Sequence, residues 1–100
     1  MIIRLFALWI VLVSYTYADQ FQLKAQRNNR SYVLELVPVT VKQGNTVVFQ
    51  GRTDKLGRFD ISVANGPYTL ETQDYEQGHG SVNITVDGAP TIKVVEVPMH

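Results

Sequence analysis

The sequence predicts an all-β fold, a small antiparallel Greek-key β-sandwich of about seven short strands. Apolar and polar residues alternate along several segments, which is typical of strands with one buried face. Turn signals separate these segments at roughly 8–12-residue intervals. No segment carries the period of an amphipathic helix. Together these features favour two sheets that bury their apolar faces against each other.

One segment, residues 52–70, organises this pattern. It holds two turn signals, at 54–57 and 65–67, on either side of a strictly alternating strand. In that strand the apolar side chains share one face, and the inward pattern resumes after the second turn. We therefore expect this segment to build the fold rather than to bind a ligand. Its expected turn and core residues are Asp54, Gly57, Phe59, Gly66, Tyr68 and Leu70.

Strands are predicted on both sides of this segment. Residues 19–26 alternate strictly, and residues 31–41 form a strand that breaks or bends near Pro38, where the parity of the apolar residues switches. Further strands are expected at 46–50, 68–73, 82–86 and 91–97. The polar run 74–81, which contains Gly78-His79-Gly80, is expected to be a flexible loop.

The first eighteen residues have the layout of a secretory signal peptide. Arg4 supplies the basic start, residues 5–13 are apolar throughout, and Ala18 is a small residue at the cleavage point. This apolar run is far shorter than the ~20 residues of a membrane-spanning helix. We expect residues 1–18 to be removed on export, which leaves 19–100 as one periplasmic or extracellular domain without a stable membrane span. An uncleaved N-terminal anchor is the alternative.

Composition excludes several classes of partner and functional site. The expected mature chain carries eight basic and nine acidic side chains without a long run of one sign, so no nucleic-acid partner is expected. The chain has no cysteine, which excludes disulfides, a thiolate nucleophile and cysteine-ligated metal sites. A domain of this size buries only ~60% of its unfolded surface, so we expect an apolar β core of modest stability.

Residues 51–59 read Gly-Arg-Thr-Asp-Lys-Leu-Gly-Arg-Phe, and residues 66–70 read Gly-Pro-Tyr-Thr-Leu. These stretches resemble the T-D-x-x-G-x-F turn and the G-x-Y-x-L element of the carboxypeptidase regulatory-like domain. That family belongs with the transthyretin-like, or prealbumin-like, sandwiches. The valine-rich strand around Pro38 is similar too, so the resemblance covers residues 31–97. It implies a transthyretin-like fold and a non-catalytic binding or spacer module.

Catalytic residues are not evident. One relative, the transthyretin-like hydrolase of purine breakdown, uses His and Arg side chains and ends in a Tyr-Arg-Gly-Ser-type tail, whereas the sequence here ends in Val-Pro-Met-His. A second, the B-type repeat of Gram-positive adhesins, forms a Lys–Asn isopeptide bond beside a buried Glu. Strand alternation, however, turns Glu71 away from the core. No nucleophile–base pair and no phosphate-binding loop are recognisable, so we expect neither catalysis nor a cofactor.

A metal site is not expected either. Asp74, Glu76 and His79 share one polar run but lack a dense ligand spacing such as that of an EF-hand, and a solvated loop explains them better. Two N-glycosylation sequons begin at Asn29 and Asn83, and they matter only in a eukaryotic source.

The leading hypothesis is a non-enzymatic secreted or periplasmic module that binds a protein partner or contributes to an envelope assembly. Sheet edges of small sandwiches pair with partner strands, and the edge is expected at the strand interrupted by Pro38 or at residues 31–36. The alternative is a carbohydrate-binding module that uses exposed aromatic side chains, with Tyr32, Tyr75 and Phe21 as candidates. A transthyretin-like hydrolase is the third and least favoured hypothesis.

Overall fold

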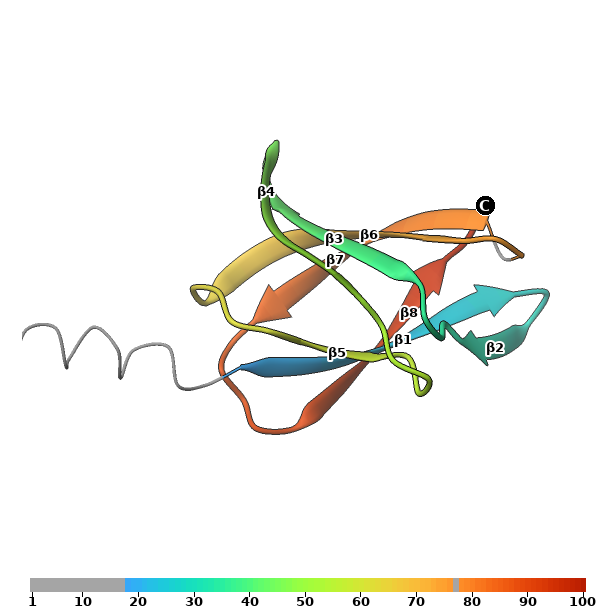
Figure 1. Cartoon of the computed structure of the whole chain (residues 1–100), viewed down its shortest axis with the longest axis horizontal. Coiled ribbons are helices and arrows are strands. Elements are labelled where there is room, and N and C mark those ends of the chain that lie inside the picture. Colours follow the sequence, from blue (N-terminus) through green and yellow to red (C-terminus); the bar gives the residue numbers. More distant parts are fainter. Residues whose placement is uncertain (1–17, 77) are drawn as a thin grey trace, which may run out of the picture.

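The structure, a computed structural model, describes residues 18–76 and 78–100 and contains eight strands (Figure 1). The strands are β1 (Asp19–Arg27), β2 (Arg30–Val33), β3 (Pro38–Gln43), β4 (Thr46–Arg52), β5 (Arg58–Ile61), β6 (Gly66–Asp74), β7 (Gly78–Val86) and β8 (Ile92–Pro98). Within these residues no helix is long and apolar enough to cross a membrane. The predicted signal peptide lies outside the described residues, apart from Ala18.

The strands form two four-stranded sheets. In the first, β2 and β5 pair with successive parts of one edge of β1, and β8 pairs with the other edge. The second has the order β4-β3-β6-β7 and is antiparallel throughout. The predicted all-β sandwich is therefore confirmed. One pairing differs from the prediction, because β1 and β8 run parallel.

The core lies between the two sheets and is built from the inward positions of both. Its largest fully buried apolar side chains are Phe21, Leu23, Leu34, Val39, Val41, Ile61, Leu70, Val86 and Val97. Phe59 stacks on Phe21 within its own sheet and on Phe49 of the other sheet, with ring centroids 5.6 Å apart in both pairs. This aromatic stack therefore joins the two sheets.

The turn at 54–57 is held by the side chain of its first residue. Asp54 Oδ1 accepts hydrogen bonds from the backbone N–H groups of Arg58 at 2.9 Å and Leu56 at 2.8 Å. These two donors, Arg58 foremost, keep the pKa of Asp54 below its ordinary value of 3.8. Gly57 has a positive φ of 76° and lies against the backbone carbonyl of Leu23. This turn, with Phe59, Tyr68 and Leu70 buried beyond it, forms part of the scaffold.

The chain breaks before Pro38, as predicted, but the strand that follows is not an edge. β2 ends at Val33, and β3 begins at Pro38 and lies between β4 and β6. Proline is tolerated there because the first residue of a strand need not donate to the ladder. Thr53 closes the break, since its hydroxyl accepts from Val37 N–H at 2.9 Å and donates to the Leu34 carbonyl at 2.6 Å. Of the two predicted edges, only the four-residue β2 lies at a sheet border.

The prediction of a flexible loop at 74–81 is wrong for most of these residues. β6 continues to Asp74, and β7 begins at Gly78, so Gly78, His79 and Gly80 belong to a strand. Gly80 is needed for close approach: a Cβ atom there would lie 2.5 Å from the carbonyl oxygen of Pro98. The glycines that suggested flexibility thus let the end of β8 pack against β7.

Candidate functional site

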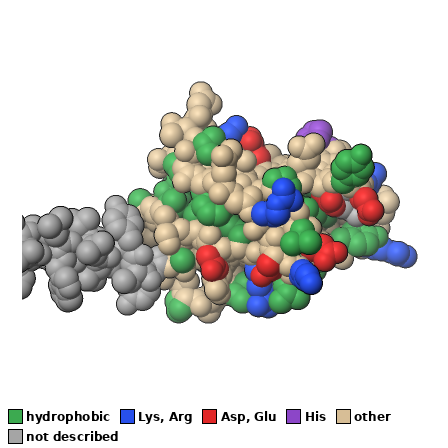
Figure 2. Space-filling model, viewed as in Figure 1, with side chains coloured by type: hydrophobic (Ala, Val, Ile, Leu, Met, Phe, Trp, Pro, Cys, Tyr) green, Lys and Arg blue, Asp and Glu red, His purple; other side chains and the backbone are tan. Residues whose placement is uncertain are grey.

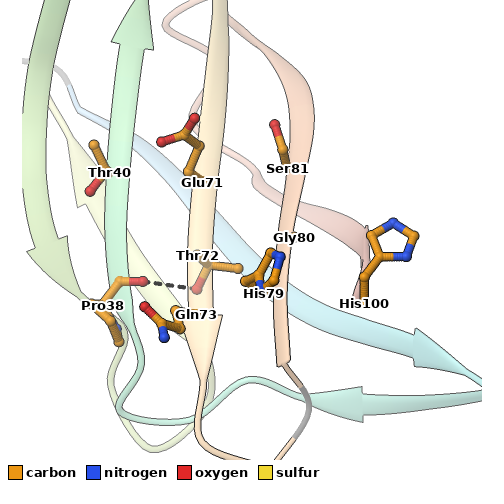
Figure 3. Close-up of a pocket in the computed structure, with 9 residues that line it drawn as sticks. All are labelled: Pro38, Thr40, Glu71, Thr72, Gln73, His79, Gly80, Ser81 and His100. Atoms are coloured by element: carbon orange, nitrogen blue, oxygen red, sulfur yellow. Dashed lines mark hydrogen bonds between the residues drawn. The ribbon is translucent and has the colours of Figure 1, made fainter.

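A shallow pocket lies on the outer face of the β4-β3-β6-β7 sheet (Figure 3). Its volume is about 470 Å³. The residues that line it are Pro38, Thr40, Glu71, Thr72, Gln73, His79, Gly80, Ser81 and His100. They come from β3, β6 and β7 and from the segment that follows β8. Most of these side chains carry hydrogen-bonding groups, and none is aromatic apart from the two imidazoles.

The pocket brings together the two histidines of the chain. The N–H of His100 donates to the carbonyl of His79 at 2.8 Å, and the N–H of His79 donates to the carbonyl of His100 at 3.2 Å. Sequence reasoning placed His79 in a loop and His100 at the end of the chain, and it missed this pairing. The glycines on both sides of His79 were the available signal, because they permit a neighbouring backbone to approach.

A serine and an acid share the pocket with His79 without forming a catalytic arrangement. Ser81 lies two residues from His79 on the same face of β7, and Glu71 lies opposite Ser81 on β6. No hydrogen bond joins these three side chains in the described part of the chain. Glu71 instead pairs with Lys42 at 3.0 Å. The outward orientation of Glu71 agrees with the strand alternation and keeps it away from the core.

Asp19, the first residue of β1, is the centre of a second polar cluster, which stabilises the fold. Asp19 is 2% exposed, and its carboxylate accepts from the backbone N–H groups of Asp87 at 3.0 Å and Gly88 at 2.9 Å. Lys93 Nζ lies 2.8 Å from Asp19, contacts Asp87 as well and stands 5.5 Å from the centre of the Phe21 ring. This cluster ties β1 to the β7–β8 turn and to β8.

Burial alone would lower the pKa of Lys93, but hydrogen bonds to the Asp19 and Asp87 carboxylates outweigh it, and the pKa is raised. The hydrogen bond from Lys93, followed by that from the Ala89 N–H, lowers the pKa of Asp87. The amine therefore stays protonated and the Asp87 carboxylate ionised, so neither group is suited to act as a nucleophile or a proton donor near neutral pH.

The outer edge of β4 is a free sheet edge in the described structure. β4 pairs only with β3, and the hairpin of these two strands projects beyond the rest of the described domain (Figure 1). From Thr46 to Gly51 the strand carries no charge and no proline. Val47 is 45% exposed, whereas Phe49 turns toward the core. A bulge between the pairs Val41–Phe49 and Lys42–Val47 makes the ladder irregular near the hairpin tip.

The three aromatic side chains considered for a ligand surface differ in exposure and do not line one common hollow. Phe21 is 1% exposed, which rules it out as a surface aromatic. Tyr32 lies on β2 and is 40% exposed. Tyr75 is fully exposed after β6 and lines a hollow of about 290 Å³ together with Leu36, Arg52 and other residues. Tyr32 does not line that hollow.

Leu36 gives the rim of this second hollow a fixed shape. Its φ is 54°, a conformation that branched aliphatic residues rarely adopt. Two hydrogen bonds hold it, since its N–H donates to the Asp54 carbonyl at 3.1 Å and its carbonyl accepts from the Arg52 guanidinium at 2.7 Å.

Charged side chains are mixed over the visible surface. Figure 2 shows acidic and basic groups interspersed on one face, without a broad area of one sign. In the described residues no group of three or more His, Cys, Asp or Glu side chains is arranged to hold a metal ion. In particular, Asp74, Glu76 and His79 do not converge.

Comparisons with known proteins leave the family open. No family model matches the chain, and no curated protein matches its sequence. A solved structure that is similar is that of Klebsiella pneumoniae 5-hydroxyisourate hydrolase, at 12% identity and a TM-score of 0.47. The similarity covers 80% of this chain and 86% of the hydrolase chain. A likeness of this size does not assign an activity.

Proposed function

We propose that the chain is a non-enzymatic, exported β-sandwich module that binds a protein partner through the free edge of β4. The observation that carries this proposal is the uncharged stretch from Thr46 to Gly51, which pairs with β3 on one side only and lies on a projecting hairpin. Free backbone N–H and C=O groups along such an edge pair readily with a strand from another chain. An envelope component that offers an extended segment is the class of partner that fits.

Several other sheet edges carry features that hinder strand addition. β2 and β5 have four residues each, and β8 carries Lys93 and Glu96. The beginning of β7 is met by Met99 and His100. Short strands, charges and covering segments are the usual means by which proteins protect an edge. On β4 only the bulge near the hairpin tip serves that purpose.

The proposal also states that the chain is exported and that it belongs to the carboxypeptidase regulatory-like class. Export is supported by the pattern of residues 1–18. The class is supported by the motif residues of the 54–57 turn, where Asp54 caps the turn and Gly57 takes a positive φ. Modules of that class serve as binding or spacer units, which agrees with a pocket that lacks a linked nucleophile and base.

A pair of matched variants tests the edge. Val47→Glu places a charge on the free edge of β4, opposite Lys42, and should abolish partner binding while the domain stays folded. Val94→Glu is the control, since Val94 is 55% exposed on β8, an edge strand of the other sheet. Each variant is compared with wild type by affinity capture from envelope extract of the source organism and by a thermal melt. Equal capture by wild type and Val47→Glu would contradict the proposal.

Carbohydrate binding is a second candidate, favoured by the hollow beside Tyr75. A fully exposed tyrosine next to the Arg52 and Glu35 side chains provides a stacking surface with neighbouring hydrogen-bonding groups. On a glycan array, Tyr75→Ala should lose any glycan that wild type retains. If wild type binds no glycan, or if Tyr75→Ala binds equally well, the hollow is not a sugar site.

A further inference from the structure

His79 and His100 lie directly opposite each other on neighbouring backbones. Each N–H donates to the carbonyl of the other residue, at 3.2 and 2.8 Å. In an antiparallel pair that exchanges both bonds, the Cα atoms are about 5.5 Å apart and the two side chains emerge on the same face. The two histidines therefore occupy adjacent backbone positions, and both line the same pocket. Figure 3 shows their rings set apart, so binding of one ligand by both requires the rings to turn toward each other.

The surrounding backbone keeps the two histidines in this register. Gly78 and Gly80 flank His79, and a Cβ atom at either position would collide with residues 98–100. The isolated bridge between Gly80 and Met99 continues the pairing by one residue. On the other side of His79, Gln73 of β6 is its direct partner, so Gln73, His79 and His100 form a row across one sheet face.

From this geometry we propose that His79 and His100 form a two-histidine site for a divalent first-row transition-metal ion. Imidazole nitrogen is a preferred ligand of Zn²⁺, Ni²⁺ and Cu²⁺, and affinity in that group is greatest for Cu²⁺. The site provides two imidazole ligands and leaves the remaining positions to water. This inference is independent of the proposed edge binding, because the two histidines lie on β7 and after β8, whereas β4 lies at the opposite border of the second sheet from β7.

Metal binding at this place would strengthen the closure of the sandwich. His79 belongs to the second sheet, and His100 follows β8, which belongs to the first. An ion held by both side chains would connect the two sheets at the end where β7 meets the residues after β8. Because such an ion binds the folded chain in preference to the unfolded one, it would also raise the melting temperature.

Calorimetric titration of the untagged chain with Zn²⁺ alone tests the site. We expect one ion per chain. His79→Gln and His100→Gln should each weaken binding by about tenfold or more, since loss of an outer-shell partner alone typically costs 10–100-fold. Binding should weaken as the solution is acidified, because protons compete for the same nitrogens. Cu²⁺ should selectively broaden the amide NMR signals of the pocket residues, Gln73 and Ser81 among them.

Asp74→Asn is the matched control, since Asp74 lies near His79 on the neighbouring strand but outside the pocket lining. It should leave Zn²⁺ affinity unchanged. The metal-free melting temperatures of both glutamine variants should equal that of wild type, because both imidazoles are exposed. The proposal is overturned by the absence of saturable Zn²⁺ binding, by equal affinity in wild type and both glutamine variants, or by a loss of affinity in Asp74→Asn as large as in those variants.

Discussion

Gly57 shows how a single residue constrains this fold. Its φ of 76° lies in the left-handed region, and a Cβ atom would come within 2.9 Å of the Leu23 carbonyl and 2.7 Å of Val33 Cγ1. The positive φ destabilises any residue that has a side chain, whereas the short contacts to Leu23 and Val33 add a steric clash that is specific to this position. Two glycine positions allow these effects to be separated.

Gly44→Ala and Gly57→Val form the corresponding experiment. Gly44 also has a positive φ, of 61°, but a Cβ atom there would have no neighbour within 4 Å. Gly44→Ala should therefore lower the free energy of unfolding only by the cost of a left-handed backbone conformation, which is about 1–2 kcal/mol. Gly57→Val adds a collision with backbone and should leave the domain unfolded. Urea denaturation measures both. Similar stabilities for the two variants would mean that crowding at Gly57 is unimportant.

Asp54 predicts how stability responds to acid. Its folded-state pKa lies below 3.8 because the N–H groups of Arg58 and Leu56 bond its ionised form. The folded state therefore binds fewer protons than the unfolded state. The resulting stability is fully present above pH 3.8 and is lost as the pH falls through the folded-state pKa. Asp87, whose pKa is lowered by Lys93, contributes with the same sign.

Urea melts at neutral pH and at pH values below 3.8 test this dependence. Wild type should lose stability on acidification, and Asp54→Asn should lose less, since the amide keeps an acceptor oxygen but does not titrate. Asp60→Asn is a suitable control, because the described structure shows no hydrogen bond to the Asp60 carboxylate. The interpretation fails if Asp54→Asn and wild type lose equal stability on acidification.

At the scale of elements, local alternation was sufficient to place most strands. The predicted strands at 19–26 and 46–50 correspond to β1 and β4, and the break near Pro38 separates β2 from β3. Alternation reports which face of a strand is buried, and here that information was reliable for Phe59, Tyr68 and Leu70.

Local alternation could not predict which strands and residues lie next to each other in the fold. The parallel pairing of β1 with β8, the central place of β3 and the meeting of His79 with His100 all join residues far apart in the chain. No local pattern encodes such contacts. The free edge of β4 and the histidine pocket, on which the two proposals rest, depend on such contacts. Sequence analysis therefore found the scaffold and the exposed Tyr75, but neither the β4 edge nor the histidine pocket.

Gly80→Ala tests whether close approach is the reason for the glycine in β7. The added Cβ atom would lie 2.5 Å from the Pro98 carbonyl and 2.7 Å from Val97 Cγ1, so residues 98–100 should move away from β7. Hydrogen exchange should then be slow at the His100 amide in wild type and fast in Gly80→Ala. The neighbouring Ser81→Ala, on an exposed side chain, should preserve the protection. A His100 amide unprotected in wild type would argue against the pairing.

At the scale of the whole molecule, the aromatic stack through Phe59 connects the two sheets. Phe59 lies between Phe21 of β1 and Phe49 of β4, so it contacts both layers. No disulfide supports the sandwich, since the chain has no cysteine. In a domain with so small a core, the apolar contacts of this one ring are a large share of the total stability.

Phe59→Ala should therefore unfold most of the population. A buried phenylalanine replaced by alanine costs about 3–5 kcal/mol, which is close to the whole stability of ~3–5 kcal/mol that a single core of this size provides. Tyr75→Ala removes an aromatic ring that is fully exposed and should melt like wild type. Circular dichroism and urea denaturation distinguish these outcomes. A cooperative melt of Phe59→Ala near the wild-type temperature would show that the sheets are held together without the stack, and the Asp19–Lys93 cluster would then be the next connection to remove.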